Sequence, residues 1–149
     1  MSIRIRKGQG QDLEQISRNN LEMALETEGK KLDPESVMKA TRAVLEGRAD
    51  AVYYVVEKDG RILSQLMITR EWSDWRNCFF WWIQSVYTVP EERGKGHFKK
   101  LFSYVLEKAR EEGACGLRLY VDRENTPAMR IYEALGMKPT NYELYELEF

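Results

Sequence analysis

Hydrophobic and polar positions in the first third of the chain follow two different periods. Residues 3–6 alternate between isoleucine and arginine, which is the period of a half-buried strand, and the segment 8–10 then interrupts the pattern. From Asp12 onward, apolar residues recur at helical spacing, and a second helical stretch follows Asp33 and Pro34. These patterns predict a short strand followed by two helices.

The middle of the chain predicts an antiparallel hairpin followed by a buried strand. Residues 51–56 are apolar and mostly β-branched or aromatic, residues 59–60 are an Asp-Gly turn signal, and residues 62–69 supply the returning strand. After a second turn at 72–75, the segment 79–89 shows almost no polar alternation. Such a run is typical of a central strand that is covered on both faces.

The last third of the chain predicts two further helices, a strand and an extended tail. Apolar residues over 98–109 form one helical stripe, and residues 128–135 form another. Residues 117–121 have the composition of a strand. In the tail 142–149, apolar and polar residues alternate as in a strand, but the alternation shifts by one residue between 144 and 145. The predicted order is β-α-α-β-β-β-α-β-α-β, with a further strand allowed at the end. This order indicates an α/β sheet with helices on both faces.

Length and charge narrow the class of protein. A chain of 149 residues can bury a substantial core, so one domain over residues 1–149 is expected. The 23 Lys and Arg against 24 Asp and Glu argue against nucleic-acid binding. No window approaches the roughly 20 apolar residues of a membrane span, and the N-terminus lacks a signal-peptide pattern. A cytoplasmic protein without a membrane segment is therefore expected.

The cysteines and the histidine limit the metal and redox chemistry. Two Cys and one His cannot complete a four-ligand zinc site, so no metal is expected. Cys78 and Cys115 lack CxxC spacing, so we expect both thiols to be reduced rather than bonded to each other. Neither is placed like an activated nucleophile, which argues against a covalent enzyme intermediate.

Candidate chemistry concentrates where the buried strand turns into the third predicted helix. Gly94 and Gly96 permit positive φ and close backbone approach, so successive amides can form an anion site at a helix start. Cations surround this segment at Arg93, Lys95, Lys99 and Lys100. A nucleotide hydrolase would need GxxxxGK followed by Ser or Thr, whereas His97 follows Gly96. A plain strand-to-helix turn with solvated lysines is the alternative.

A second motif makes the interpretation more specific. It reads Asn-x-x-Ala-x-x-x-Tyr-x-x-x-Gly-Met and comprises Asn125, Ala128, Tyr132, Gly136 and Met137. With Arg93 to Phe98, which matches the loop pattern Arg/Gln-x-x-Gly-x-Gly/Ala, the chain resembles the GNAT superfamily of N-acetyltransferases. The resemblance extends over the strand and helix order from Ile3 to Phe149.

The resemblance implies a mixed, mostly antiparallel twisted sheet and acetyl-CoA as co-substrate. It implies that the backbone of Val86, Tyr87 and Thr88 holds the pantetheine arm and polarises the thioester carbonyl. Tyr132 would protonate the departing thiolate, although ordinary packing is an alternative role for this side chain. The implied cofactor-binding set also includes Arg93, Gly94, Lys95, Gly96, His97, Phe98, Lys99 and Asn125. Capping of the last helix is an alternative role for Asn125.

Four residues near these motifs carry separate expectations. Phe98 replaces the last small residue of the loop pattern, so either the diphosphate shifts or the ring packs beneath the loop. Trp82 and Gln84 occupy the region where many family members have a glutamate base, so the resemblance does not identify the base here. His97 is expected to face solvent or phosphate rather than the thioester.

Carboxylates and tryptophans are the candidates for binding the acetyl acceptor. We expect a primary amine of a small molecule or peptide, attracted by Glu26, Glu28, Trp72 and Trp75. Glu71 is the candidate general base, acting directly or through water. The same carboxylates could be solvated surface charges, and the same tryptophans would suit a homodimer interface.

The expected function is transfer of an acetyl group from acetyl-CoA to a primary amine by direct attack. Two alternatives stay open. The missing family glutamate allows a catalytically idle acyl-CoA-binding module, and the tryptophan turn allows a protein-interaction module.

Overall fold

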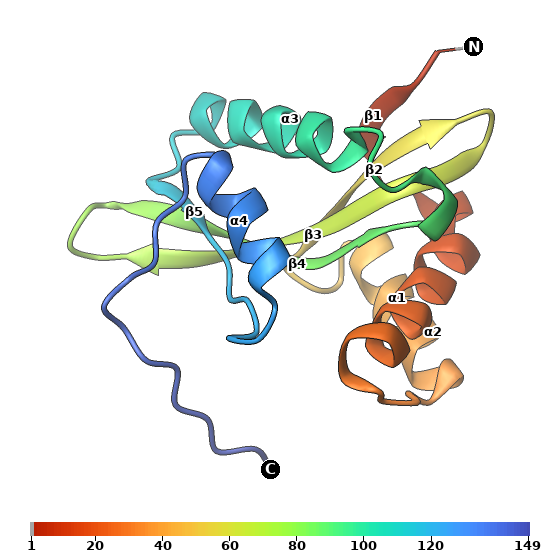
Figure 1. Ribbon diagram of the computed structural model, residues 1–149, viewed down its shortest axis with the longest axis horizontal. Helices are drawn as coiled ribbons and strands as arrows, with labels where there is room; N and C mark the ends of the chain where they lie inside the picture. The colour runs from red at the N-terminus through yellow and green to blue at the C-terminus, as the bar shows by residue number, and fades with distance from the viewer. Residues whose placement is uncertain (1) are drawn as a thin grey trace. The chain divides into compact units, whose positions relative to one another are not determined.

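The structure is a computed structural model that describes residues 2–149 (Figure 1). It divides the chain into two compact units, one ending at Leu119 and the other formed by Tyr120–Phe149. A single domain over residues 1–149 stays a prediction. Within residues 2–149, no helix has the length and apolar character needed to cross a membrane.

The first unit contains three of the four α-helices and all five strands seen in residues 2–149. The elements are β1 (Arg4–Lys7), α1 (Leu13–Glu28), α2 (Pro34–Leu45), β2 (Val52–Lys58), β3 (Arg61–Ser73), β4 (Cys78–Thr88), α3 (His97–Glu111) and β5 (Gly116–Arg118). Local sequence explains where α2 begins, because the Asp33 carboxylate accepts a hydrogen bond from the Ser36 amide and Pro34 occupies the first turn.

The five strands form one mixed sheet in the order β1-β2-β3-β4-β5. All neighbouring pairs are antiparallel except β4 and β5, which are parallel. This confirms the predicted α/β class and the order of the first eight elements. The β3 strand runs four residues beyond the predicted end at 69, so Trp72 lies in a strand and only Trp75 lies in the turn. The β5 strand is shorter than the predicted 117–121.

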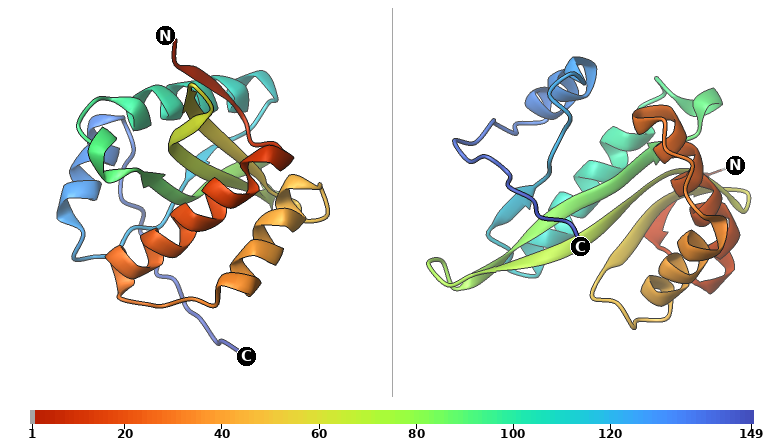
Figure 2. Two further views of the ribbon diagram at one scale, coloured as in Figure 1. Left: turned by 90° about the vertical axis from the view of Figure 1, so that its right-hand side faces the viewer. Right: turned by 90° about the horizontal axis from the view of Figure 1, so that it is seen from below.

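Helices cover both faces of this sheet (Figure 2). On one face, Ile16 of α1 packs in a buried cluster with Tyr53 and Val55 of β2. Tyr54 points to the opposite face, where its ring lies 6.0 Å from the ring of Tyr104 in α3. Neighbouring residues of a strand point to opposite faces, so α1 and α2 share one side of the sheet and α3 covers the other.

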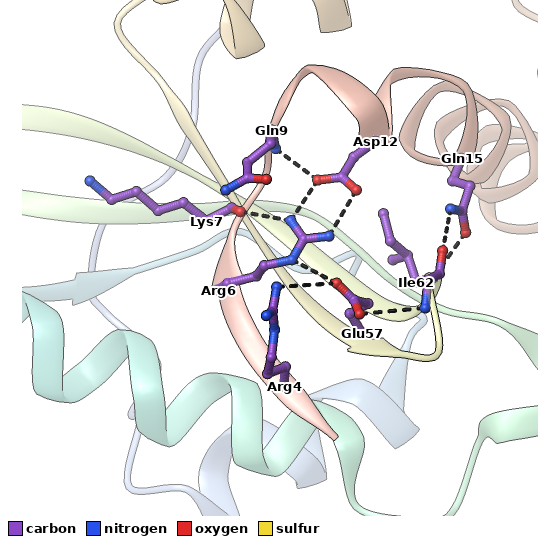
Figure 3. A network of polar contacts seen from close by, with 9 residues as sticks. Arg4, Arg6, Lys7, Gln9, Asp12, Gln15, Glu57 and Ile62 are labelled. Carbon is purple, nitrogen blue, oxygen red and sulfur yellow. Dashed lines mark hydrogen bonds and ion pairs between the residues drawn. The ribbon is translucent and has the colours of Figure 1, made fainter. Parts of the chain in front are cut away.

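A buried ion-pair network fixes β1 to the start of α1 (Figure 3). The Arg6 guanidinium donates to both oxygens of Asp12, at 2.7 and 2.9 Å, and to Glu57 of β2 at 2.8 Å. Burial alone would raise the pKa of Asp12, but hydrogen bonds from Arg6 and from the Gln9 amide hold it below its ordinary value. The network thus anchors the N-terminal strand beside β2.

The two cysteines form a disulfide, which corrects the expectation that they are reduced. Cys78 begins β4 and Cys115 immediately precedes β5, with their Cα atoms 5.6 Å apart. The Cys115 amide donates to the Phe79 carbonyl at 2.8 Å, so the parallel pairing of β5 with β4 brings the two side chains together. The absence of CxxC spacing excludes only a local pair and does not exclude this distant one.

The second unit contains one helix and the tail. In α4 (Thr126–Ala134), the Asn125 side chain accepts a hydrogen bond from the Ala128 amide, and Gly136 has positive φ just after the helix, as the helical pattern predicts. The predicted final strand over 142–149 is wrong for this structure, because these residues form no strand pairing and are all exposed. A strand needs a partner ladder, and apolar alternation by itself does not supply one.

Candidate active site

β4 has a bulge on its β3 side, and β5 leaves part of its other edge unpaired. Gln65 of β3 pairs with Tyr87, whereas Met67 pairs with Gln84, so β4 carries one extra residue at this point. Ser85 within the bulge has a φ of 52°, in the left-handed region. β5 pairs with β4 only at Phe80–Trp82. Beyond residue 82, the side of β4 that faces away from β3 therefore has no strand partner among residues 2–149.

This open edge leads directly into the glycine loop. After β4 ends, a short 3-10 turn over Pro90–Glu92 precedes Gly94 and Gly96, whose φ angles are 77° and 82°. α3 begins at His97 with no side-chain cap, so its first amides remain available to a ligand. The left-handed backbone and the helix N-terminus lie at the predicted residues. Anion binding at this loop stays a prediction.

Arg93 anchors the loop instead of pointing freely from it. Its Nε donates to the Thr88 carbonyl at 2.8 Å, and a terminal nitrogen donates to Glu26 at 2.8 Å. Its guanidinium also lies 5.2 Å from the centre of the Tyr87 ring. Lys95 pairs with Glu92 at 3.1 Å, while Lys99 and Lys100 are exposed on the first turns of α3. The loop is therefore held in place by contacts within the first unit.

His97 and Phe98 support the loop from below. The His97 side chain is 6% exposed, contrary to the expected position facing solvent, and its Nε2 lies 2.9 Å from Glu92 Oε1. This contact, followed by that of Lys95, lowers the pKa of Glu92. The Phe98 ring is partly buried and lies 6.1 Å from the Phe102 ring one turn further along α3, and the two expectations for its effect on the loop stay predictions.

Glu26, Tyr87 and Arg93 form a polar cluster at the inner end of β4, which we call the Tyr87 cluster. The Tyr87 hydroxyl donates to Glu26 Oε1 at 3.2 Å, and the residue is 6% exposed. Burial, followed by the charge of Glu26, raises the pKa of Tyr87. The sequence predicts a role for the backbone of Tyr87 but none for its side chain. Its side-chain role depends on a contact with the end of α1, 61 residues away, which no local pattern reveals.

Glu71 lies in a different environment. Trp82 Nε1 donates to one oxygen of Glu71 at 2.8 Å, and Arg118 donates to the other at 3.1 Å. The Arg118 guanidinium stacks 3.6 Å from the centre of the Phe80 ring. Trp75, at the tip of the β3–β4 hairpin, is 86% exposed. We call this group at the outer end of β3 and β4 the hairpin cluster.

The predicted acceptor residues therefore fall into two groups. Gln65 of β3 pairs with Tyr87 of the Tyr87 cluster. Glu71 lies six residues further along β3, which is a distance of roughly 20 Å. Glu26 belongs to the Tyr87 cluster, and Glu28 lies exposed at the end of the same helix. Trp72 is 51% exposed and contacts Phe79 edge to face in the hairpin cluster. The structure does not bring all five acceptor candidates into one pocket.

A buried amide network holds α1 against the sheet beside the Tyr87 cluster. Asn19 donates to the Gln65 side-chain carbonyl at 2.9 Å, and Gln65 donates to Asn20 at 3.0 Å. Gln65 has no exposed surface. The sequence does not predict this network, because Gln65 stands in an otherwise apolar strand pattern with no local sign of its partners. The network fixes the helix that carries Glu26.

Tyr132 and Asn125 lie in the second unit. Tyr132 is half-buried in α4, and burial raises the pKa of its phenol above the ordinary value. Asn125 caps α4 through the hydrogen bond to the Ala128 amide, at 3.3 Å. The capping role expected as an alternative is thus present, and a cofactor-binding role for Asn125 stays a prediction.

Comparison with known proteins agrees with this geometry. Residues 14–137 match the acetyltransferase (GNAT) family. A solved structure described as a possible acetyltransferase from Clostridium difficile 630 is 41% identical, with a TM-score of 0.93 covering 100% of this chain and 99% of that one. A mycothiol acetyltransferase from Kocuria rhizophila is 39% identical over 56 residues, or 36% of this chain and 18% of the relative. The chain thus spans about a fifth of the length of that relative.

A third likeness concerns the fold alone. A predicted acetyltransferase from Clostridium acetobutylicum, whose structure was solved with acetyl-CoA, is 19% identical with a TM-score of 0.77 over 99% of this chain and 96% of that one. The family match spans most of the chain, and the sheet, bulge and loop have the arrangement described above. The chain belongs to the GNAT acetyltransferase family.

Proposed function

We propose that this protein transfers the acetyl group of acetyl-CoA to a primary amine of a small molecule or peptide. The proposal rests on two features of the backbone that follow each other directly along the chain. The open edge of β4 supplies unpaired backbone groups, and the strand then leads within a few residues into the left-handed glycines before α3. An extended thioester arm ending in phosphates needs these two kinds of site, in this order.

Each feature has a distinct task in the proposed reaction. The amides of the loop and of the first turn of α3 would hold the diphosphate, aided by Lys99 and Lys100. The backbone of Val86, Tyr87 and Thr88 would hold the pantetheine arm and polarise the thioester carbonyl. Because these groups are fixed before the ligand arrives, they favour the negative charge that develops on the carbonyl oxygen.

We propose that the Tyr87 cluster takes the proton from the attacking amine. The Tyr87 phenol already donates to Glu26, so its oxygen can accept a proton from the ammonium, directly or through a water, as its own proton moves to Glu26 Oε1. The amine nitrogen then forms its bond to the acetyl carbon and releases a second proton to solvent water, while the carbon–sulfur bond breaks. Glu71 lies about 20 Å away along β3 and would attract the acceptor from a distance.

Protonation of the departing sulfur is assigned to Tyr132. A phenol is a suitable donor to a thiolate, and burial raises the pKa of this one, so the proton stays on the oxygen until sulfur takes it. The assignment rests on the family motif that contains Tyr132. No cysteine participates, because Cys78 and Cys115 are joined to each other.

A screen of amine acceptors tests the proposed function. The purified protein is incubated with acetyl-CoA and with polyamines, aminoglycosides, amino acids or peptides, while thiol release and the product mass are followed. We expect release to depend on a cationic amine and the product to gain one acetyl group. Binding of acetyl-CoA without turnover on any amine would indicate the idle binding module. The absence of binding would contradict the proposal.

A further inference from the structure

The bulge in β4 changes which side chains share a face of the sheet. In a regular strand, the side chains of Gln84 and Tyr87 would point to opposite faces, because an odd number of positions separates them. Here Gln84 pairs with Met67 and Tyr87 pairs with Gln65, and these two partners are only two positions apart on β3. The extra residue of the bulge therefore brings Gln84 and Tyr87 onto one face.

This shared face is the one that α1 and α2 cover. Gln65 is hydrogen-bonded to Asn19 of α1, and Met67 packs against a buried cluster that includes part of α1. Two positions along a strand span about 7 Å, so Gln84 lies about this far from Tyr87 along the ladder. A nitrogen atom that donates to an oxygen on either side, at about 2.9 Å each, bridges nearly that gap. One amine can therefore contact both side chains.

The side-chain amide of Gln84 is oriented by Thr69. Its Nε2 donates to Thr69 Oγ1 at 2.6 Å. Thr69 pairs with Trp82 and so lies on the outer side of Gln84, whereas Tyr87 lies on its inner side. Oε1 of Gln84 has no hydrogen-bond partner among residues 2–149, and the residue is partly exposed. Because the nitrogen is held on the outer side, the oxygen is left as an acceptor for a ligand beside Tyr87.

We propose that Gln84 binds the attacking amine through Oε1 and makes the site selective for primary amines. This inference rests on the proposed function. A primary ammonium has three N–H groups. As nitrogen bonds to the acetyl carbon and the carbon–sulfur bond breaks, one proton passes to Tyr87, one is released to solvent water, and the third stays in the amide product. Oε1 holds this third N–H, and Thr69 is a positioning residue because it acts through the amide of Gln84.

A secondary amine lacks the N–H that Gln84 would hold. Once its nitrogen has lost one proton to Tyr87 and one to water, none is left to donate to Oε1. The amide oxygen then faces an alkyl group without a partner, and a site built to bond an N–H discriminates against such an analogue. The neutral amide of Gln84 also takes no proton from the amine, so its loss should affect acceptor recognition separately from the proton path.

Two matched probes measure this selectivity. The full-length protein is given acetyl-CoA with either n-butylamine or N-methylbutylamine, and kcat/KM for each is obtained from thiol release. The wild type should prefer n-butylamine by at least about 10-fold. Gln84→Met keeps the length of the side chain and removes the amide, so kcat/KM for n-butylamine and the preference should each fall about 10-fold. The affinity for acetyl-CoA should stay unchanged.

Three further variants separate this role from a structural one. Thr69→Ser keeps the hydroxyl and should keep the wild-type preference, whereas Thr69→Val removes the hydroxyl and should lose part of the preference. Gln15→Met is the matched control, because Gln15 bonds only to the backbone of the β2–β3 turn, at Gly60 and Ile62. It should leave kcat/KM for both probes unchanged.

A binding measurement separates failure of this inference from failure of the proposed function. In nuclear magnetic resonance, n-butylamine is titrated into the isotope-labelled protein saturated with CoA, and the side-chain amide signals of Gln84 and Gln15 are followed. Each signal is assigned by its absence from the corresponding methionine variant, and only that of Gln84 should shift. A shift without turnover of any amine would contradict acetyl transfer and support the amine site. An unshifted Gln84 signal, or a preference that is the same in Gln84→Met, would overturn the inference.

Discussion

The two ends of the β3–β4 ladder have the same backbone pairing and very different surroundings. At the inner end, Gln65 and Tyr87 are buried beneath α1, and every polar side chain of the Tyr87 cluster has a fixed partner. At the outer end, Glu71 and Trp75 are exposed. An end where the buried Gln65 and Tyr87 are held by hydrogen bonds is suited to chemistry that needs positioned groups, and an exposed aromatic end is suited to recognition. The inner and outer ends of this strand pair therefore suit different tasks, and they lie roughly 20 Å apart.

Removing the proton path at the inner end should have the largest effect. Tyr87→Phe keeps the ring beneath Arg93 but loses the hydroxyl, and Glu26→Gln keeps the side-chain size but loses the basic oxygen. Each should lower kcat by about 10²-fold, the lower range for general acid–base catalysis. Steady-state kinetics with the best amine from the screen measures this.

Glu28→Gln is the matched control for the inner end, because Glu28 is an exposed carboxylate on the same helix. Its kcat should equal that of the wild type. If the Glu28 variant lost as much activity as the Glu26 variant, the two carboxylates would have the same role, and the special position of the Tyr87 cluster would be refuted.

Tyr132→Phe should reduce kcat to a similar or somewhat smaller extent. The substitution keeps the packing of the ring in α4 and removes only the transferable proton, so kcat should fall about 10²-fold while acetyl-CoA affinity changes little. The measurement must be made where the chemical step limits the rate. Unchanged kcat under that condition would leave Tyr132 with a packing role only.

The disulfide should stabilise the outer end without taking part in catalysis. The chain separation of 37 residues between Cys78 and Cys115 predicts a loss of about 3 to 4 kcal/mol in unfolding free energy when both become serine. Chemical denaturation of the double variant, beside the wild type with and without reductant, measures the loss. A large fall in kcat at a temperature where the variant is folded would show that the two ends are coupled.

Glu71→Gln should have the smallest effect. Because this carboxylate is proposed to attract the acceptor from a distance, KM should rise about 3- to 10-fold for a cationic amine while kcat is preserved. A kcat that falls instead, with loss of its acidic limb in the pH profile, would restore Glu71 as the general base.

Much of the fold could be predicted because its signals are local. The stripe of α3, the cap at Asp33 and the glycines before His97 each depend on residues close in sequence, and the structure places them as expected. The disulfide and the Tyr87 cluster could not be predicted, because each depends on which strands become neighbours. Gln65 shows the same limit, since a buried amide in an apolar strand gives no sign of the helix that satisfies it.

The predicted terminal strand failed for a related reason. The alternation from Tyr142 to Phe149 identifies a segment able to form a strand, but the presence of a partner is a property of the assembled molecule. Similarly, the acceptor candidates Glu26 and Glu71 share a charge but belong to different ends of the ladder. Residue type indicated the chemistry, and only the sheet register showed the separation.

The most direct test of the account is calorimetric titration of acetyl-CoA into the wild type and into Gly96→Val. Valine strongly disfavours the left-handed φ of 82° at Gly96, so the loop amides should lose their alignment. Gly113→Val is the matched control, because Gly113 has a φ of 75° at the other end of α3. The account predicts binding to the wild type and to Gly113→Val, and at least about 100-fold weaker binding to Gly96→Val. Equal affinity in all three proteins would contradict it.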